Sequence, residues 1–399
     1  MSPAYSSGLS KQKQVPIWLD CDTGHDDAFA VLLSAQHPAA KLLGISTVYG
    51  NAPLERTTEN TRAILKAIGR EDVPVFPGAQ RPLSREAAHA PDIHGETGLD
   101  GTTFLPEPTV PARTDMSAVD AMIQFISSQP RGCVWIVAVA CLTNIAMLFA
   151  KRGDLVNHIA GLSIMGGAIG DRFTNAPMGK TKGGGERFGN WTPWAEFNIY
   201  IDPEAADIIF SNPALAAKTT LITLDLTHQF LATPEIQYGF LGIGQSWNSE
   251  PTMRSVTPLR RLFFEILTFF AKTYAEQFGL VAGPPNHDPL AVAIVLVPQF
   301  FGCNALGECS GDQGERFHVK IITDGAHSSS GDITSDPSQC GRTVATLLPP
   351  GYEGVRIPRG LNTKELWALL EGCLSRAEHS IAGAFVGLSS VMKSEVTQS

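Results

Sequence analysis

The chain has 399 residues, of which 43% are hydrophobic and 17% are charged. This composition supports a large buried core and excludes a disordered protein. The formal net charge of −9 comes without clusters of Lys and Arg, which disfavours binding to nucleic acid, so we expect a small-molecule ligand rather than a polyanion.

The predicted elements alternate along the chain between short apolar strands and amphipathic helices. Val15 to Cys21 form the first strand, and an acidic, Gly-containing loop connects it to a helix with acidic residues in its first turn. The pattern then recurs several times. Strands are expected at 15–21, 41–48, 133–140, 161–167 and 219–226, with helices at 26–36, 50–69, 142–152 and 202–210.

The last third of the chain predicts two helical segments near 232–241 and 255–278, a helix-like run at 287–296, and a β-rich stretch near 317–348. Continuous apolar strands separated by helices indicate an α/β fold with a single open, mostly parallel (mixed) sheet covered on both faces, of the Rossmann-like kind. No repeat or Pro/Ser-rich linker divides the chain. We expect one domain at 15–372, with tails at 1–14 and 373–399.

The cysteine pattern and the start of the chain bear on location. Seven cysteines form no C-x-x-C pair and are odd in number, which suggests neither a zinc site nor a complete disulfide framework. The first fifteen residues lack the apolar region of a signal peptide, and no apolar run is long enough to span a bilayer. We therefore expect a cytoplasmic protein without a membrane partner.

Four carboxylates, those of Asp20, Asp22, Asp26 and Asp27, fall within eight residues at the end of the first strand and the start of its helix. Open α/β sheets bind their ligands at this edge. Carboxylates so close together repel one another unless a cation or raised pKa values relieve them, and a hard, oxygen-seeking cation such as Ca²⁺ or Mg²⁺ is implied. The alternative is an Asp-rich loop in which one residue caps the helix and the others are solvated.

Two other classes share this chemistry. An EF-hand counted from Asp20 would need a carboxylate at Val31, so that class is excluded. A haloacid-dehalogenase-like phosphatase would use Asp20 as its nucleophile, and the G-D-x-x-x-D element at 331–336 resembles the late acidic motif of that family. Against it, Thr-Gly follows Asp22 instead of Gly-Thr, and a polar turn is the simpler interpretation of 331–336.

Two more polar groups are candidates for chemistry. His287 and Asp288 lie on a Pro-rich loop immediately before an apolar run, where the carboxylate could complete a metal site and the imidazole could serve a leaving group. Asn190, Glu196 and Asn198 precede a predicted strand at 198–202 and offer the paired donors and acceptors that sugar hydroxyls need. On spacing alone, an N-cap Asp beside a surface or hydrogen-bonded His is the favoured explanation of His287 and Asp288. Capping of a loop explains Asn190, Glu196 and Asn198 as well as sugar binding does.

Taken together, LDCDTGHDDA (19–28), YGN (49–51), DIHGETGLDG (92–101), LTNIA (142–146), SIMGG (163–167), AEFNIYIDPEAA (195–206) and NHDPLAVA (286–293) resemble the inosine-uridine preferring nucleoside hydrolase family. The match keeps its order over most of residues 16–370, and it is similar in particular to fungal uridine nucleosidases. The D-x-D-x-x-x-D-D start coupled to a distant His-Asp is highly specific.

The resemblance implies calcium-dependent hydrolysis of the N-glycosidic bond of ribonucleosides, uridine or inosine, to free base and ribose. It implies one Ca²⁺ on Asp22, Asp27, Asp288 and the main-chain carbonyl of Val139. A water on the metal would be the nucleophile and Asp22 its general base. Asp20 would orient metal ligands without touching the ion.

The resemblance also assigns the nucleoside contacts. The ribose 2′- and 3′-hydroxyls would meet Asp26, Asn51, Asn198 and Asp288, and the 5′-hydroxyl would meet Asn190 and Glu196. Met165 would line the sugar pocket, His287 would protonate or hydrogen-bond the departing base, and His94 would approach the base from the other side. A homodimer or homotetramer is implied as well.

Two questions stay open from the sequence. The segment 170–187 could be a lid over the sugar or a surface loop, and a surface loop is favoured slightly. Besides the hydrolase and the phosphatase, a nucleoside-binding protein that has lost turnover would keep the same pocket, although every proposed catalytic side chain is present.

Overall fold

The computed structural model describes residues 14–180, 188–242, 256–303, 314–328 and 338–396, the last fourteen of these by their backbone alone. Its centre is a six-stranded sheet in the order β3-β2-β1-β4-β5-β6, in which every pair of neighbours is parallel. The expected open α/β sheet is confirmed. Its strands are β1 (Val15–Cys21), β2 (Ala40–Thr47), β3 (Val75–Pro77), β4 (Trp135–Ala138), β5 (Gly161–Met165) and β6 (Thr219–Ile222).

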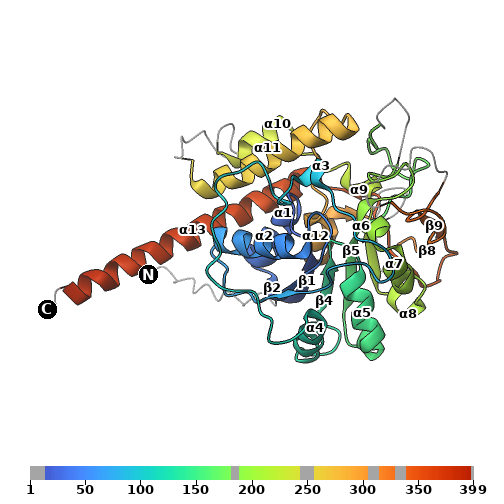
Figure 1. The fold of residues 1–399 in the computed structure, drawn as a ribbon, viewed down its shortest axis with the longest axis horizontal. Helices are drawn as coiled ribbons and strands as arrows, with labels where there is room; N and C mark the ends of the chain where they lie inside the picture. The colour runs from blue at the N-terminus through green and yellow to red at the C-terminus, as the bar shows by residue number, and fades with distance from the viewer. Residues whose placement is uncertain (1–13, 181–187, 243–255, 304–313, 329–337, 397–399) are drawn as a thin grey trace, which may run out of the picture.

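Helices cover both faces of this sheet because its strands are apolar on both sides (Figure 1). In β1, Ile17, Leu19 and Cys21 point into one core cluster and Trp18 into the other. The first face carries α1 (Asp27–Gln36), α2 (Leu54–Ala67), α12 (Pro289–Leu296) and α13 (Thr363–Val396); the second carries α4 (Ala118–Ser127), α5 (Thr143–Lys151) and α7 (Pro203–Phe210).

The structure also describes six other helices and two 3-10 turns. They are α3 (Pro91–His94), α6 (Phe197–Ile201), α8 (Pro213–Ala216), α9 (Leu224–Thr227), α10 (Pro234–Phe240), α11 (Pro258–Phe278) and the 3-10 turns Gly153–Asn157 and Pro298–Phe300. Among the described strands, antiparallel pairs form two small sheets, β8 (Phe317–Ile321) with β9 (Thr343–Leu347) and β7 (Phe301–Gly302) with β10 (Gly360–Leu361).

The strand order changes direction between β1 and β4, because the chain moves outward to β2 and β3 before it returns to the other side of β1. In sheets of this type a crevice opens beyond the carboxyl ends of the two strands that flank such a switch point. The loops after Cys21 and after Ala138 therefore face a common space.

The strand expected at 198–202 is wrong, since residues 198–201 belong to the helix α6 and Asp202 is the N-cap of α7. Glu196 is the N-cap of α6, and its carboxylate accepts hydrogen bonds from the backbone N–H groups of Asn198 and Ile199. The run Asn-Ile-Tyr-Ile is compatible with either element by propensity, and the cap decides for the helix.

The expected tail at 373–399 begins inside α13. Cys373, Leu374 and Ala377 are fully buried against the first face of the sheet, so the first turns of this helix belong to the core. Figure 1 shows the rest of the helix extending away from the body of the molecule. Among the described residues, no helix combines the length and the apolar character needed to cross a bilayer.

Candidate active site

A buried group of carboxylates lies at the switch point of the sheet. Asp22, Asp26 and Asp27 come from the loop after β1 and the start of α1, and Asp288 comes from the end of the loop before α12. The carboxylate of Asp26 accepts hydrogen bonds from the backbone N–H groups of His287 and Asp288. The two acidic segments, which are remote in sequence, thus meet in the fold.

The carboxylates are close enough to share a cation. Oxygens of Asp26, Asp27 and Asp288 all lie within 4.8 Å of one another, and Asp22 interacts with both Asp27 and Asp288. All four side chains are at least 94% buried, with exposures of 0 to 6%. The group within this distance includes Asp26 and not Asp22. The family resemblance implies the reverse, with Asp22 on the metal and Asp26 on the sugar.

Two features of these carboxylates favour the binding of a cation. Burial raises the pKa of Asp22, Asp26 and Asp288 well above the usual carboxyl range, and the charges of the neighbouring carboxylates raise it further. Asp22 Oδ1 is buried and has no hydrogen-bond partner in the described structure. A divalent cation with a preference for oxygen would neutralise the group and use the free oxygen, so these residues fit such an ion.

The acidic loop is held in place by its own backbone and by Asn51. Asp27 accepts hydrogen bonds from the backbone N–H of Asp22 at 3.1 Å, from that of Gly24 at 2.9 Å and from Asn51 Nδ2 at 3.0 Å. The backbone N–H of Asn51 donates to Asp22 Oδ2 at 2.8 Å. A side chain at Gly50 would collide with the Asp22 carboxylate, which explains the glycine in the YGN motif.

The second side of the cavity is built from α6 and the strand ends. Asn198 Nδ2 donates to the carbonyl of Val139 at 3.1 Å and lies 3.5 Å from Met165 Sδ. Val139, Asn190 and Asn198 line the cavity. Asn190 Oδ1 accepts from the backbone N–H of Phe197 at 2.8 Å, and the same side chain hydrogen-bonds to the hydroxyl of Tyr274.

Glu196 and Met165 do not line this cavity. The Glu196 carboxylate accepts three backbone N–H groups, including that of Gly167 at 2.8 Å. Burial raises the pKa of Glu196 to about 7 in spite of these bonds. In this geometry the Glu196 carboxylate fixes the start of α6, which carries Asn198.

His287 is fixed at both ring nitrogens. Thr227 Oγ1 lies 2.7 Å from Nδ1, and the hydroxyl of Tyr274 lies 2.8 Å from Nε2. Burial holds the pKa of His287 well below its ordinary value, so the ring is neutral near pH 7. Because Tyr274 also lines the cavity, its hydroxyl connects the imidazole with the place a ligand would occupy.

His94 forms the opposite wall and is supported by His25. The two Nδ1 atoms are 3.1 Å apart, and His25 Nε2 lies 2.9 Å from the carbonyl oxygen of Asp100. Burial lowers the pKa of both rings. The ring of Phe270 stacks on His25 with centroids 5.4 Å apart and packs against His94 at 5.3 Å.

Several residues of this site were not predicted from the sequence: His25, Trp191, Thr227, Phe270, Tyr274 and Phe278. The aromatic residues at 270, 274 and 278 are spaced by four and therefore share one face of α11. That spacing was the available signal, but the same pattern describes any helix that packs on a core.

The structure disfavours the phosphatase. Asp20 is fully buried, and its Oδ1 already accepts hydrogen bonds from Ser46 and, at 2.8 Å, from Asn144 Nδ2. A nucleophile must be able to reach its substrate. The acidic element at 331–336 lies outside the described residues.

The segment 170–187 is described as far as Lys180. Asp225 accepts the backbone N–H groups of Ile169 and Gly170 at 2.7 and 3.0 Å, and His228 Nδ1 lies 2.6 Å from the carbonyl oxygen of Pro177. This part is thus anchored to α9 and the residue after it. Residues 181–187 lie outside the described part of the chain.

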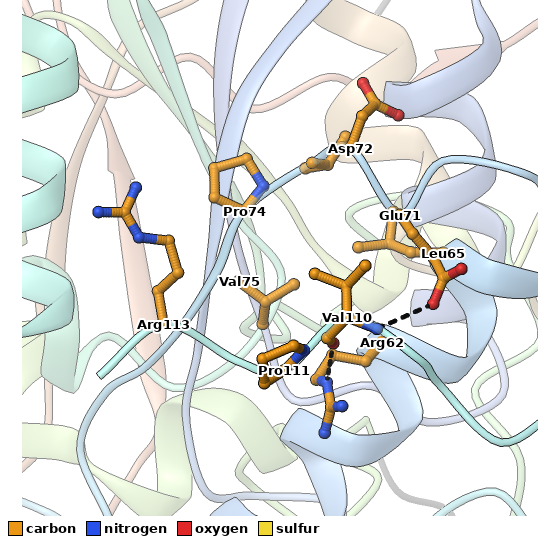
Figure 2. Close-up of a pocket in the computed structure, with 10 residues that line it drawn as sticks. Arg62, Leu65, Glu71, Asp72, Pro74, Val75, Val110, Pro111 and Arg113 are labelled. Atoms are coloured by element: carbon orange, nitrogen blue, oxygen red, sulfur yellow. Dashed lines mark hydrogen bonds between the residues drawn. The ribbon is translucent and has the colours of Figure 1, made fainter. Parts of the chain in front are cut away.

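A second hollow of about 300 Å³ lies between α2 and the segments 71–75 and 110–113 (Figure 2). Its floor is apolar, and Arg62, Glu71, Asp72 and Arg113 surround it with mixed charges. None of the residues that line this hollow also lines the cavity at the switch point of the sheet. The switch-point cavity therefore remains the candidate active site.

Comparison with known proteins identifies the family of the chain. The model of the inosine-uridine preferring nucleoside hydrolase family matches residues 17–368. The chain is 37% identical to the uridine nucleosidase of Saccharomyces cerevisiae over 369 residues, which cover 92% of this chain and 97% of that protein. It is 38% identical to a pyrimidine-specific ribonucleoside hydrolase of a Shewanella species over 72% of this chain and 79% of the relative.

Among solved structures, a purine-preferring ribonucleoside hydrolase from Gardnerella vaginalis superposes with a TM-score of 0.70 at 24% identity, covering 91% of this chain and 98% of that one. A plant nucleoside hydrolase superposes with a TM-score of 0.65 at 25% identity, over 90% and 98% of the two chains. The first of these shows a shared fold, and the sequence matches over nearly the whole chain show the family. This chain belongs to the inosine-uridine preferring nucleoside hydrolase family.

Proposed function

We propose that the protein hydrolyses the N-glycosidic bond of ribonucleosides, with uridine and inosine as substrates, and that it uses Ca²⁺. The observation that carries this proposal is the buried group of Asp22, Asp26, Asp27 and Asp288 around one unpaired carboxylate oxygen. The family match over residues 17–368 and the uridine nucleosidase relative support the substrate class.

We assign the ion to Asp22, Asp27, Asp288 and the carbonyl of Val139. A divalent ion bound there would lower the pKa of a water molecule. Asp22 would be the general base that takes the proton of the attacking water, because its Oδ1 is free of hydrogen bonds. Asp20 keeps the loop in place through Ser46 and Asn144.

The sugar would lie between the acidic loop and α6. Asp26, Asn51, Asn198 and Asp288 would bind the 2′- and 3′-hydroxyls, and Asn190 would bind the 5′-hydroxyl, with Glu196 and Met165 behind them. As the bond to the base breaks, positive charge develops on the ribose, and fixed carboxylates stabilise that charge more than they stabilise the substrate.

The departing base would leave between His94 and the pair of His287 and Tyr274. Because His287 is neutral, its role is to polarise and orient the Tyr274 hydroxyl by the 2.8 Å hydrogen bond, so that the pair can hydrogen-bond the base as negative charge develops on it. His94 contacts the base from the other side. A homodimer or homotetramer in the cytoplasm completes the proposal, and light scattering of the purified protein tests the assembly.

The test is release of free base and reducing sugar from a panel of ribonucleosides by calcium-loaded protein. We expect turnover of uridine and inosine, loss of activity with a chelator or in Asp22→Ala, and retained base release in Asp20→Asn. Phosphate release from phosphomonoesters, abolished in Asp20→Asn, would instead establish the phosphatase. Stable binding of unhydrolysed nucleoside by active-site titration would establish a binding protein.

A further inference from the structure

One wall of the candidate active site is carried by a long segment without regular secondary structure. Between β3, which ends at Pro77, and α3, which begins at Pro91, the described chain forms neither helix nor strand. Ala90 at its end, and Ile93 and His94 of the adjoining α3, line the cavity that Asn198 also lines. Backbone hydrogen bonds hold the two ends of the segment, since the N–H of Gly78 donates to Thr47 and that of Ala90 donates to Asn51. No ladder or helix holds residues 80–89 between these ends, so their position depends on contacts with side chains.

Arg85 makes the strongest of these contacts. Its guanidinium donates to both carboxylate oxygens of Glu204, with Nε 2.9 and 3.0 Å from Oε1 and Oε2 and Nη2 2.6 Å from Oε1. Nη2 also donates to the carbonyl oxygen of Thr323 at 2.5 Å. The two side chains are only 18% and 29% exposed, so this pair is shielded from water more than an ordinary surface ion pair.

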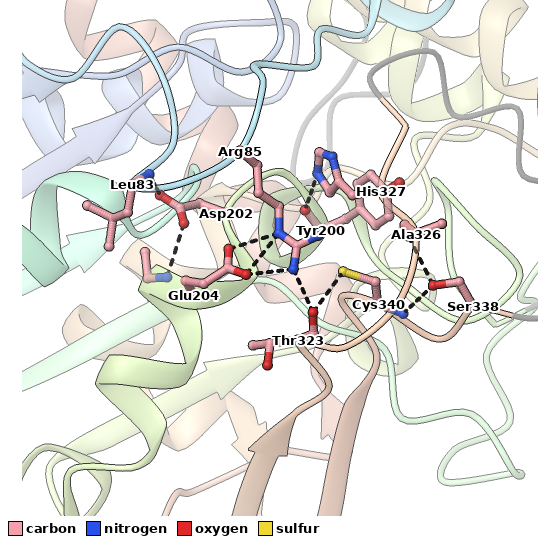
Figure 3. A network of polar contacts seen from close by, with 11 residues as sticks. Leu83, Arg85, Tyr200, Asp202, Glu204, Thr323, Ala326, His327, Ser338 and Cys340 are labelled. Atoms are coloured by element: carbon pink, nitrogen blue, oxygen red, sulfur yellow. Dashed lines mark hydrogen bonds and ion pairs between the residues drawn. The ribbon is translucent and has the colours of Figure 1, made fainter.

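A second contact holds the same segment against α7. The backbone N–H of Leu83 donates to Asp202 Oδ2 at 3.0 Å, while Asp202 Oδ1 caps α7 by accepting the N–H of Ala205 at 3.1 Å. Figure 3 shows the backbone nitrogen of Leu83 beside Asp202 and the guanidinium of Arg85 facing Glu204. Asp202 and Glu204 lie at the start of one helix. The irregular segment is therefore attached to the first turn of α7.

Arg85 donates to Glu204 and Thr323, and both are connected to α6, which carries a sugar contact in our proposal. α7 follows α6 directly, and α6 carries Asn198. Thr323 follows β8, and the nearby ring of His327 stacks on Tyr200 of α6 with centroids 4.4 Å apart and an interplanar angle of 8° (Figure 3). α7 itself packs against α5 and β8, so it is a firm anchor.

We propose that Arg85 is a positioning residue for the nucleobase: through Glu204 and Thr323 it holds the wall formed by Ala90, Ile93 and His94 at the right distance from the sugar site. It takes no part in bond cleavage. The inference rests on the proposed function, since it concerns how the same site receives the base. Loss of the pair should weaken binding of the base and leave the reaction of bound substrate nearly intact.

The test compares Arg85→Gln, Glu204→Gln and the double variant with the calcium-loaded wild-type protein. We expect KM for uridine and inosine to rise about tenfold in each single variant, with no further rise in the double variant. We expect kcat to stay within about twofold, and inhibition by D-ribose, which lacks a base, to be unchanged. Arg85→Lys should restore part of the affinity, because an ammonium can reach Glu204 without matching both acceptors.

Arg113→Gln is the matched control, since Arg113 also pairs with a carboxylate, that of Asp115, but at an exposed place away from the cavity. It should leave KM unchanged. A lower melting temperature of Arg85→Gln with unchanged KM would show a merely structural pair and overturn the proposal, as would a fall in kcat at unchanged KM. Wild-type protein that released no base would instead contradict the proposed function itself.

Discussion

Replacement of Tyr274 by Phe removes one hydroxyl from the candidate active site. The ring of Tyr274 packs edge-on against Phe270 and Phe278, with centroids 4.6 and 4.8 Å away, and Phe preserves these contacts. The lost hydroxyl lies 2.8 Å from His287 Nε2 and also hydrogen-bonds to the side chain of Asn190. Because Tyr274 is 3% exposed, water cannot easily replace the lost partner.

The expected effect follows from two contributions. The lost hydrogen bond to His287 is worth about 1 kcal/mol, and a buried imidazole nitrogen without a partner costs a further ~1–2 kcal/mol, while Asn190 keeps its bond to the backbone N–H of Phe197. If both are felt as the base departs, kcat/KM for uridine should fall roughly 30- to 150-fold. Initial rates of base release measure this, with Tyr238→Phe as control because Tyr238 is 51% exposed. A change of less than threefold in Tyr274→Phe would refute the role of the His287–Tyr274 pair.

Three other predictions use different perturbations. Asn198→Ala should raise KM for uridine and increase the Ki of D-ribose alike, because the amide contacts Val139 at the sugar side; unchanged ribose inhibition would remove Asn198 from that role. Adding Ca²⁺ to chelator-treated protein at about 100 times its Kd should stabilise it by ~2.7 kcal/mol, seen as a higher melting temperature, and an unchanged temperature would argue against a calcium site. Burial raises the pKa of Glu196 to about 7, above the 4.5 of a free side chain. The protonated side chain therefore stabilises the folded protein below pH 4.5, and this stabilisation, up to ~3 kcal/mol, is lost as the pH rises through 7. In saturating Ca²⁺, the stability of Glu196→Gln relative to wild type should therefore improve from pH 5 to pH 8, and a difference that is constant with pH would contradict that pKa.

The parts of the site that could be predicted lie together in the sequence or follow a strand. Asp22, Asp26 and Asp27 are neighbours at the end of an apolar run, and the rule that parallel sheets bind ligands at their carboxyl edge places them. The pairing of this loop with Asp288 came from the family resemblance. Composition and periodicity alone could not have supplied it, because nothing local links residues so far apart in the chain.

The parts that could not be predicted depend on packing between distant elements. Tyr274 and Phe270 reach the cavity only because α11 crosses the end of α3, and a helix with apolar residues at intervals of four gives no hint of what it faces. The error at 198–202 has a local cause, since the short run Asn-Ile-Tyr-Ile satisfies both helix and strand and the side chain of Glu196 selects the helix. The Arg85–Glu204 pair joins two surface-like charged residues that sequence patterns leave unassigned.

The central claim is that the amino-terminal acidic loop and Asp288 together bind one divalent ion. Calorimetric titration of chelator-treated protein with Ca²⁺ tests it most directly, using Asp27→Asn, Asp288→Asn and, as control, Asp154→Asn, whose side chain is 66% exposed on the surface. We predict one site per chain in the wild type and in Asp154→Asn, with affinity reduced at least about tenfold in both active-site variants, since each loses a charged oxygen ligand. Wild-type affinity in Asp288→Asn, or base release by a protein that binds no ion, would contradict the account.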